Sequence, residues 1–273
     1  MNSPCTHVRA HKNIAMISKY LLNALVSISI LISLASCGPD TRDVRNFYFP
    51  ARELAEKGMV YIYENTGTLP GADQEFAYYL GVDQDTALYL SITQYDGTFS
   101  PRQQTRQQIE NDGAYVRDLM LLQSDSSGVA IPISTELLYA RAFPFYLNDK
   151  TDQDANGYRL RFVSPSDEAK TTYVSLNRSF RGDTTINVLG KDYPALVFDL
   201  AGEVSERDKE LGDISPQFSG FEIYAKGLGM VEYQRTLSVG ATLGGRLTER
   251  IGMDDFLKRV EQQNEVDHSG HDH

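Results

Sequence analysis

The chain lacks tryptophan and is very poor in cysteine and histidine. Its 273 residues include two cysteines, Cys5 and Cys37, and none of its five histidines lies between residues 38 and 267. Ser-His-Asp and Cys-His nucleophilic sites, and metal sites built on histidine, are therefore excluded from that segment. A pair of carboxylates suffices for glycoside hydrolysis, so a carboxylate-based hydrolase stays open as an alternative, although the lack of tryptophan counts against it.

Basic residues are scarce relative to acidic ones. The chain has 26 Lys and Arg against 37 Asp and Glu, a net charge of −11. Because the first 36 residues hold three basic residues and no acidic one, the remainder carries 23 − 37 = −14. A body this acidic repels a phosphate backbone, which argues against nucleic acid as a partner.

Long apolar runs are absent except near the start of the chain. Residues 20–34 are nearly all apolar, and Arg9, Lys12 and Lys19 precede them. A positive start followed by a short apolar run is typical of a secretory signal, and the run is shorter than the about 20 residues of a membrane-spanning helix. Met16 is an alternative to Met1 as the first residue.

The apolar run ends in Leu34-Ala35-Ser36-Cys37. This tetrapeptide resembles the lipobox of bacterial lipoprotein precursors. The resemblance implies cleavage between Ser36 and Cys37, and a diacylglycerol and an N-linked acyl chain, such as palmitate, on Cys37. Two or more acyl chains hold a protein stably at a membrane. Gly38 replaces the aspartate associated with inner-membrane retention, which favours the outer membrane of a cell envelope. An ordinary signal peptide with an incidental Cys37 is the alternative.

These features divide the chain into four predicted parts. Residues 1–36 are a signal peptide that is removed, and residues 37–57 are the acylated cysteine and a tether. Residues 58–264 form a single β-rich domain, and residues 265–273 are a disordered tail rich in His and Asp.

Apolar residues alternate with polar ones along most of the body. Residues 88–93, 158–163, 173–180 and 195–200 all show this period of two, which marks half-buried antiparallel strands. The predicted fold class is mostly antiparallel β, as a curved sheet or half-open barrel. A short C-terminal helix is expected at about residues 253–263.

Two stretches allow more than one interpretation. Residues 99–110 are interpreted as a strand, with a helix that begins near Ser100 as the alternative. The segment Phe221–Tyr233 contains Lys226-Gly227-Leu228-Gly229 and predicts a tight hairpin whose glycines supply positive φ. Over about residues 221–251 it resembles hairpins of β-rich periplasmic lipoproteins and of LolA-like half-barrel proteins. That resemblance implies a curved sheet around a cavity that accommodates lipid.

Two groups of residues are candidate metal ligands. Asp152, Asp154 and Asn156 fit the opening of a calcium-binding loop. The bidentate glutamate of an EF-hand is replaced by Val163, so an EF-hand is excluded, and a looser calcium site or a solvated acidic turn remains. In the tail, histidine and aspartate side chains offer a second, weak site for a transition metal: Asp267, His268, His271, Asp272 and His273.

The combined expectation is a membrane-anchored, non-catalytic lipoprotein of the cell envelope. It would bind an apolar ligand or an envelope partner, at residues that the sequence does not identify. Apart from the covalent lipid on Cys37, no cofactor is expected other than the calcium considered above. A structural component of an envelope complex is a further alternative.

Overall fold

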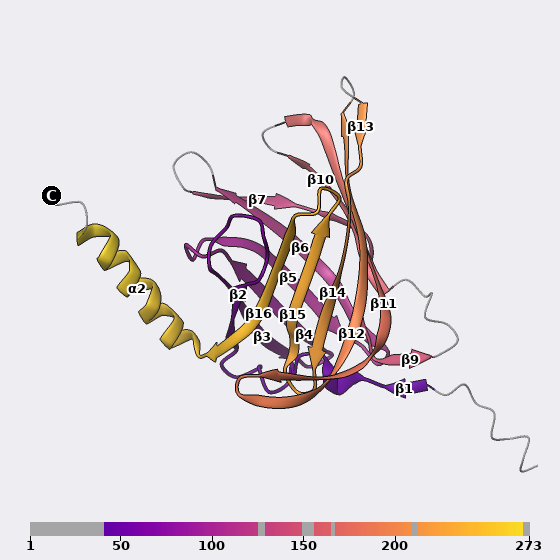
Figure 1. Cartoon of the computed structure of the whole chain (residues 1–273), viewed down its shortest axis with the longest axis vertical. Helices are drawn as coiled ribbons and strands as arrows, with labels where there is room; N and C mark the ends of the chain where they lie inside the picture. The colour runs from indigo at the N-terminus through magenta and orange to yellow at the C-terminus, as the bar shows by residue number, and fades with distance from the viewer. Residues whose placement is uncertain (1–40, 125–128, 149–155, 165–166, 209–211, 270–273) are drawn as a thin grey trace, which may run out of the picture. The chain divides into compact units, whose positions relative to one another are not determined.

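Antiparallel strands dominate the computed structural model, which describes residues 41–124, 129–148, 156–164, 167–208 and 212–269. The described residues from Arg42 onward belong to one compact unit. Twelve strands of the described chain form a continuous ring of hydrogen-bonded neighbours (Figure 1). In the order of the ring they are β11 (Asp167–Val188), β10 (Asn156–Ser164), β8 (Glu136–Pro144), β6 (Gly113–Ser124), β5 (Pro101–Ile109), β4 (Ala87–Tyr95), β3 (Gln74–Gln84), β2 (Met59–Asn65), β16 (Thr242–Ile251), β15 (Gly229–Leu237), β14 (Gln217–Ala225) and β12 (Lys191–Asp208).

The ring closes because β12 pairs with β11. Their register runs from Lys170 opposite Asp208 to Val188 opposite Lys191. The predicted mostly antiparallel β fold is therefore confirmed, and the sheet is a closed barrel where a half-open one was also expected. Closure removes the exposed sheet edges on which other chains could pair.

Shorter elements lie outside the ring of twelve strands. Strand β7 (Ala130–Ser134) pairs with β6, β13 (Gly212–Ile214) pairs with β12, and β1 (Thr41–Asp43) pairs with β9 (Tyr146–Asn148). A single 3-10 turn, η1, spans Arg45–Phe47.

The ambiguous stretches are resolved. Residues 101–109 form β5, which confirms the strand. The hairpin within 221–233 is confirmed too, with φ of +78° at Gly227 and +87° at Gly229. Helix α2 spans Met253–Ser269, so it continues through residues 265–269, which were expected to be disordered. No helix in the described ranges is long and apolar enough to cross a membrane.

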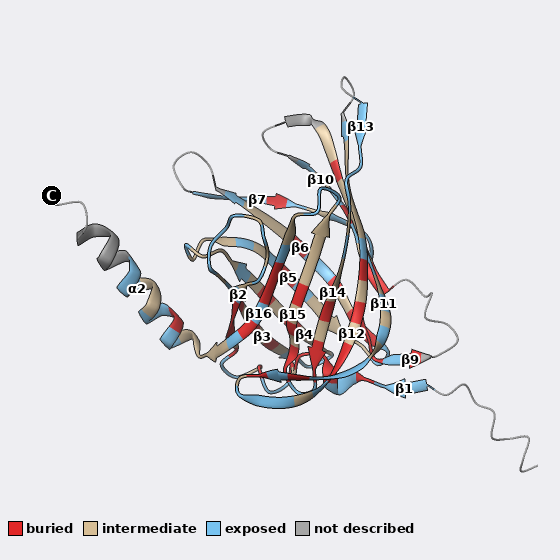
Figure 2. Ribbon diagram, viewed as in Figure 1, coloured by how far each residue is buried: buried red, intermediate tan, exposed pale blue. Residues whose placement is uncertain are grey.

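Inward-facing side chains fill the barrel most densely at one end. The alternation seen in the sequence places alternate residues of the strands in the lumen, where aromatic rings pack among aliphatic side chains. Figure 2 shows that buried positions gather in the half of the barrel at the bottom of the view. We call this end the base.

A segment that precedes the first barrel strand closes the base. Residues 44–58, here called the plug, enter the barrel and contribute the buried side chains of Val44, Tyr48, Phe49 and Leu54 to the core. The backbone N–H of Val44 donates to the carbonyl oxygen of Phe145 at 2.9 Å. Residues 44–57, which were predicted to be part of the tether, therefore lie in the base of the barrel instead.

The plug lies directly against the backbone of β3. The N–H of Gly81 donates to the carbonyl oxygen of Leu54 at 3.0 Å. A Cβ atom at position 81 would lie 1.9 Å from the carbonyl oxygen of Ala51, which no side chain could tolerate without displacement. Glycine is thus required at this crossing by close backbone approach.

A second, smaller cluster lies on the outer face of β2 and β3. It consists of Val60, Ile62, Phe76 and Phe256. Phe256 comes from the first turn and a half of α2, and its ring lies 5.4 Å from the rings of Phe76 and Phe99. The beginning of α2 is therefore held to the barrel by aromatic packing.

Candidate functional site

Most of the residues predicted as sites lie outside the described part of the chain. These are Ser36 and Cys37 in the lipobox, and Asp152 and Asp154 in the calcium motif. The third residue of that motif, Asn156, begins β10 and is buried, and its Oδ1 has no hydrogen-bond partner among the described residues. No three His, Cys, Asp or Glu residues gather closely enough in the described ranges to hold a metal ion. Calcium binding stays a prediction.

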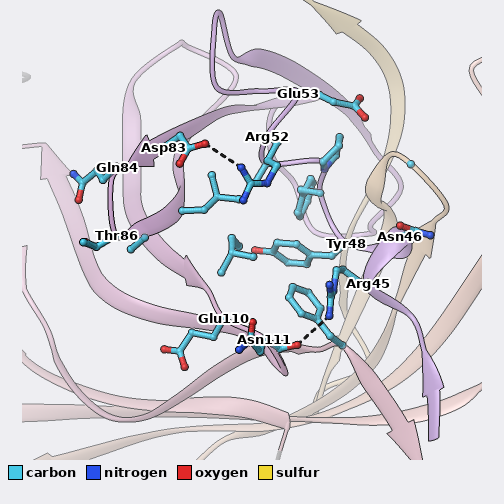
Figure 3. A pocket seen from close by; sticks show the side chains of 18 of the residues that line it. Arg45, Asn46, Tyr48, Arg52, Glu53, Asp83, Gln84, Thr86, Glu110 and Asn111 are labelled. Atoms are coloured by element: carbon cyan, nitrogen blue, oxygen red, sulfur yellow. Dashed lines mark hydrogen bonds and ion pairs between the residues drawn. The ribbon is translucent and has the colours of Figure 1, made fainter.

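A cleft of about 750 Å³ lies at the base (Figure 3). We call it the base cleft. The plug supplies one side of it, from Arg45 to Glu53. Two segments supply the other side. They are residues 83–88, from the end of β3 to the start of β4, and residues 109–111, from the end of β5 into the turn that follows.

Charged groups of both signs surround the base cleft. Arg52 pairs with Asp83 at 3.1 Å. One nitrogen of Arg45 donates to the carbonyl oxygen of Asn111 and to the hydroxyl of Tyr146, both at 3.1 Å. Both guanidinium groups are thus engaged within the protein, and exposed pairs of this kind contribute little to stability.

Tyr48 lies at the centre of the base cleft (Figure 3). Its hydroxyl donates a hydrogen bond to the side-chain oxygen of Gln107. Burial, with a smaller contribution from Tyr79, raises the pKa of Tyr48 far above its usual value. The phenol is therefore neutral at physiological pH and unsuited to act as a base or nucleophile. The described lining contains carboxylates and cationic groups and no Ser, Cys or His.

A buried ion pair joins the inner faces of β11 and β14. Arg178 of β11 donates to both carboxylate oxygens of Glu222 of β14, at 2.6 and 3.2 Å. The hydroxyl of Tyr224 adds a third hydrogen bond to this carboxylate at 2.9 Å. Arg235 of β15 approaches the same carboxylate at 3.9 Å. The side chains of Arg178 and Glu222 are 9% and 2% exposed, so solvent screens this pair very little.

The ion pair keeps both groups charged in spite of their burial. Burial alone would raise the pKa of Glu222, but the charge and hydrogen bonds of Arg178 outweigh it and lower this pKa. Burial likewise opposes the charge of Arg178, and Glu222 outweighs it and raises the pKa of the guanidinium. A carboxylate with a lowered pKa accepts hydrogen bonds but is a poor general acid at neutral pH.

Neither member of this pair was singled out from the sequence, although a signal was present. Arg178 stands between Leu176 and Phe180 in the inward phase of one strand. Glu222 likewise occupies an inward-facing position in β14, two residues before Tyr224. Opposite charges at inward positions of two strands indicate a buried pair, but only the register shows that the two meet.

We expect the unfolding free energy to decrease at both ends of the pH range. Because the folded pKa of Glu222 is lowered, its contribution is present above the unfolded value of about 4.5 and is lost as the pH falls through the folded pKa. Burial raises the pKa of Tyr61 to about 12 and that of Tyr63 and Tyr224 well above 10. Their contribution is present below about pH 10 and is lost as the pH rises above it.

Urea unfolding at a series of pH values measures this dependence. Glu222→Gln is expected to lessen the decrease in unfolding free energy at acidic pH (the acid limb) and to leave the decrease at alkaline pH (the alkaline limb) unchanged. Tyr63→Phe is expected to lessen the alkaline limb alone. An acid limb of the same slope in Glu222→Gln would contradict the assignment.

Comparison with known proteins gives two similar folds. No known family matches the chain, and no curated protein matches its sequence. A crystal structure described as that of a candidate lipoprotein from Parabacteroides distasonis matches with 10% identity and a TM-score of 0.45, over 75% of this chain and 98% of that one. A candidate exported protein with a YmcC-like fold from Bacteroides fragilis matches with 12% identity and a TM-score of 0.46, over 75% and 99%. Similarity at this level supports no inference about function.

Proposed function

We propose that the protein is a lipid-anchored, non-catalytic binding protein of the bacterial cell envelope, attached through Cys37 to the outer membrane with the base of its barrel toward the lipid. The signal-like leader and its lipobox support the attachment. The depth at which Val44 is buried in the base supports the orientation, and this is the observation that carries the proposal.

The distance from the anchor to the barrel is short. Val44, whose N–H is fixed to Phe145, stands seven positions after Cys37. Even fully extended, seven residues span at most about 25 Å. The base cleft would therefore lie close to the lipid headgroups, and the opposite end of the barrel would be free to meet a ligand or partner.

The filling of the lumen bears on what is bound. Aromatic rings and the Arg178–Glu222 pair occupy its base half, where an acyl chain would need a dry apolar cavity. This arrangement favours a polar ligand or an envelope partner over the apolar ligand that the sequence also suggested.

The alternative of a carboxylate-based hydrolase receives less support. Such an enzyme needs one carboxylic acid with a raised pKa beside a second carboxylate. Among the described inward residues, Glu222 is a carboxylate whose pKa is lowered and whose oxygens are occupied by Arg178 and Tyr224.

Metabolic labelling with a palmitate analogue tests the anchor. The unaltered protein is expected to take up label and to sediment with the outer membrane. Cys37→Ser should lose both properties because the acceptor thiol is gone, whereas the matched control Cys5→Ser should keep both. A Cys37→Ser protein that stays labelled, or a mature protein that begins at another residue, would overturn the proposal.

The same preparation tests the orientation. Thr86, in the turn after β3, and Ser238, in the turn after β15, are exposed at opposite ends of the barrel. The body has no other thiol, so a fluorophore on Thr86→Cys or Ser238→Cys reports one position once Cys37 is acylated. A quencher in the bilayer is expected to act on position 86 more strongly than on position 238. The reverse order would contradict the orientation.

A further inference from the structure

A second hollow lies inside the barrel, on the side of the aromatic core that faces away from the base. It has a volume of about 260 Å³ and lies mainly against the inner faces of β2, β3 and β15. The register aligns Tyr63 with Glu75 and Arg235 with Leu243 on this face. We call it the lumen pocket. It is separate from the base cleft, with which it shares no lining residue.

Tyrosine rings held in place form the wall and floor of the lumen pocket. The hydroxyl of Tyr63 donates to the carbonyl oxygen of Met230 at 2.9 Å and lies 3.3 Å from the hydroxyl of Tyr79. The ring of Tyr233 packs against Gly245, where a Cβ atom would approach it to 2.7 Å. These contacts fix the rings before any ligand arrives, which lowers the entropy cost of binding.

Glu75 places a negative charge at the lumen pocket. Its carboxylate accepts a hydrogen bond from the hydroxyl of Tyr233 at 2.5 Å. Within the described residues no Lys or Arg forms an ion pair with it. The residue is exposed to solvent in the lumen, so its charge is available to a ligand.

Arg235 places a positive charge at the same pocket. Its side chain is 34% exposed, and its guanidinium lies 5.4 Å from the centre of the Tyr233 ring. It approaches Glu222 only to 3.9 Å, because Arg178 already occupies that carboxylate. In the described residues its side chain donates no hydrogen bond, so the planar donor fork can receive a second carboxylate.

We propose that the lumen pocket binds a small zwitterion of the amino-acid class, with its ammonium group at Glu75 and its carboxylate at Arg235. Tyrosine faces add attraction for the ammonium group. A volume of about 260 Å³ is below the about 300 Å³ at which pockets for drug-sized ligands begin, so the site suits an amino acid and excludes an acyl chain. This inference rests on the proposed function, because it takes the barrel to bind its ligand unchanged.

Saturation-transfer NMR and calorimetry on the mature, acylated protein in detergent test the proposal. The probes are L-leucine, 4-methylpentanoate, which lacks the amino group, 3-methylbutylamine, which lacks the carboxylate, and glucose. We expect leucine to bind and each single-charge analogue to bind at least about tenfold more weakly, because each loses one charge-assisted hydrogen-bonding group. Glucose is expected to show no saturation transfer.

Matched variants locate the binding. Glu75→Gln and Arg235→Gln are each expected to weaken leucine binding by about tenfold or more. Glu232→Gln in β15 and Arg246→Gln in β16 remove a carboxylate and a guanidinium that face each other on the outside of the barrel, and are expected to change leucine binding less than about twofold. Glu75 is exposed, so its variant should fold even if the Arg235 variant is destabilised.

The outcomes separate this inference from the proposed function. No leucine binding at about 10 mM, or equal losses in the inner and outer variants, would overturn the lumen pocket and leave the palmitate-labelling result untouched. Leucine that binds and is recovered as a different compound would support the pocket and contradict the non-catalytic function.

Discussion

Replacement of Arg178 by methionine is expected to destabilise the barrel by about 3–5 kcal/mol, because it leaves a carboxylate buried without its cation. Glu222 is 2% exposed at the side chain, and would retain only the hydroxyl of Tyr224 and the more distant Arg235. Glu222→Leu is expected to cost a similar amount, since it strands the guanidinium of Arg178. Urea unfolding followed by circular dichroism measures both.

The double variant Arg178→Met/Glu222→Leu is the decisive comparison. Removing both charges also removes both desolvation penalties, so the double variant is expected to lie within about 2 kcal/mol of the unaltered protein or above it. The expected interaction energy between the two substitutions is therefore large.

An exposed pair on the same strand provides the control. Arg181 of β11 pairs with Asp199 on the outer face, where both side chains are about half exposed. Arg181→Met is expected to cost less than about 1 kcal/mol. A loss in Arg178→Met no larger than that in Arg181→Met would show that the buried pair is not a major determinant of stability.

The strands could be predicted because the alternation of apolar and polar residues is a local pattern in the sequence. Each strand has one face in the lumen and one outside, so stretches such as residues 195–200 show the period of two without knowledge of their neighbours. Closure of the ring could not be predicted in this way. It depends on pairings between distant strands, such as β2 with β16, and on the long register shared by β11 and β12.

The plug shows where periodicity fails. Residues 44–57 show no sustained strand or helix pattern beyond one possible helical turn, so they were predicted to be part of a tether. They enter the barrel from its end, and burial there follows the shape of the lumen and not a strand face. The adjacent aromatic residues Phe47, Tyr48 and Phe49 were the available signal, because a solvated tether has little reason to carry three in a row.

The candidate site residues also differ in whether the sequence alone could identify them. The lipobox at Cys37 is readable because peptidases and acyltransferases recognise a linear sequence, and it stays a prediction because it lies outside the described residues. The lumen pocket was not readable. Glu75 and Arg235 are 160 positions apart in the chain, and only the register of the closed barrel brings them to one hollow.

Phe49→Ala is expected to destabilise the protein by about 3–5 kcal/mol, because it removes the ring that fills the centre of the base. That ring stacks on the ring of Tyr79, with 4.2 Å between the ring centres, and its centre lies 5.9 Å from that of Tyr61. It also lies so close to Gly229 that a Cβ atom there would approach it to 2.3 Å. With strands on every side, the cavity left by alanine cannot collapse, and the cost includes a cavity contribution beyond the lost apolar transfer.

Phe221→Ala on the outer face of β14 is the matched control. It removes a similar ring that is only partly buried, so its expected cost is about 1 kcal/mol. Hydrogen exchange adds a second measurement, in which the amides of Val44 and Gly81 should exchange faster in Phe49→Ala, since their hydrogen bonds hold the plug to the barrel. Equal destabilisation by the two substitutions, with unchanged exchange at both amides, would mean that the plug does not depend on Phe49.

If the plug does depend on Phe49, the same ring also fixes the point at which the proposed membrane anchor leaves the barrel. A loosened plug should then weaken the preference of the bilayer quencher for position 86. The palmitate label should stay in place.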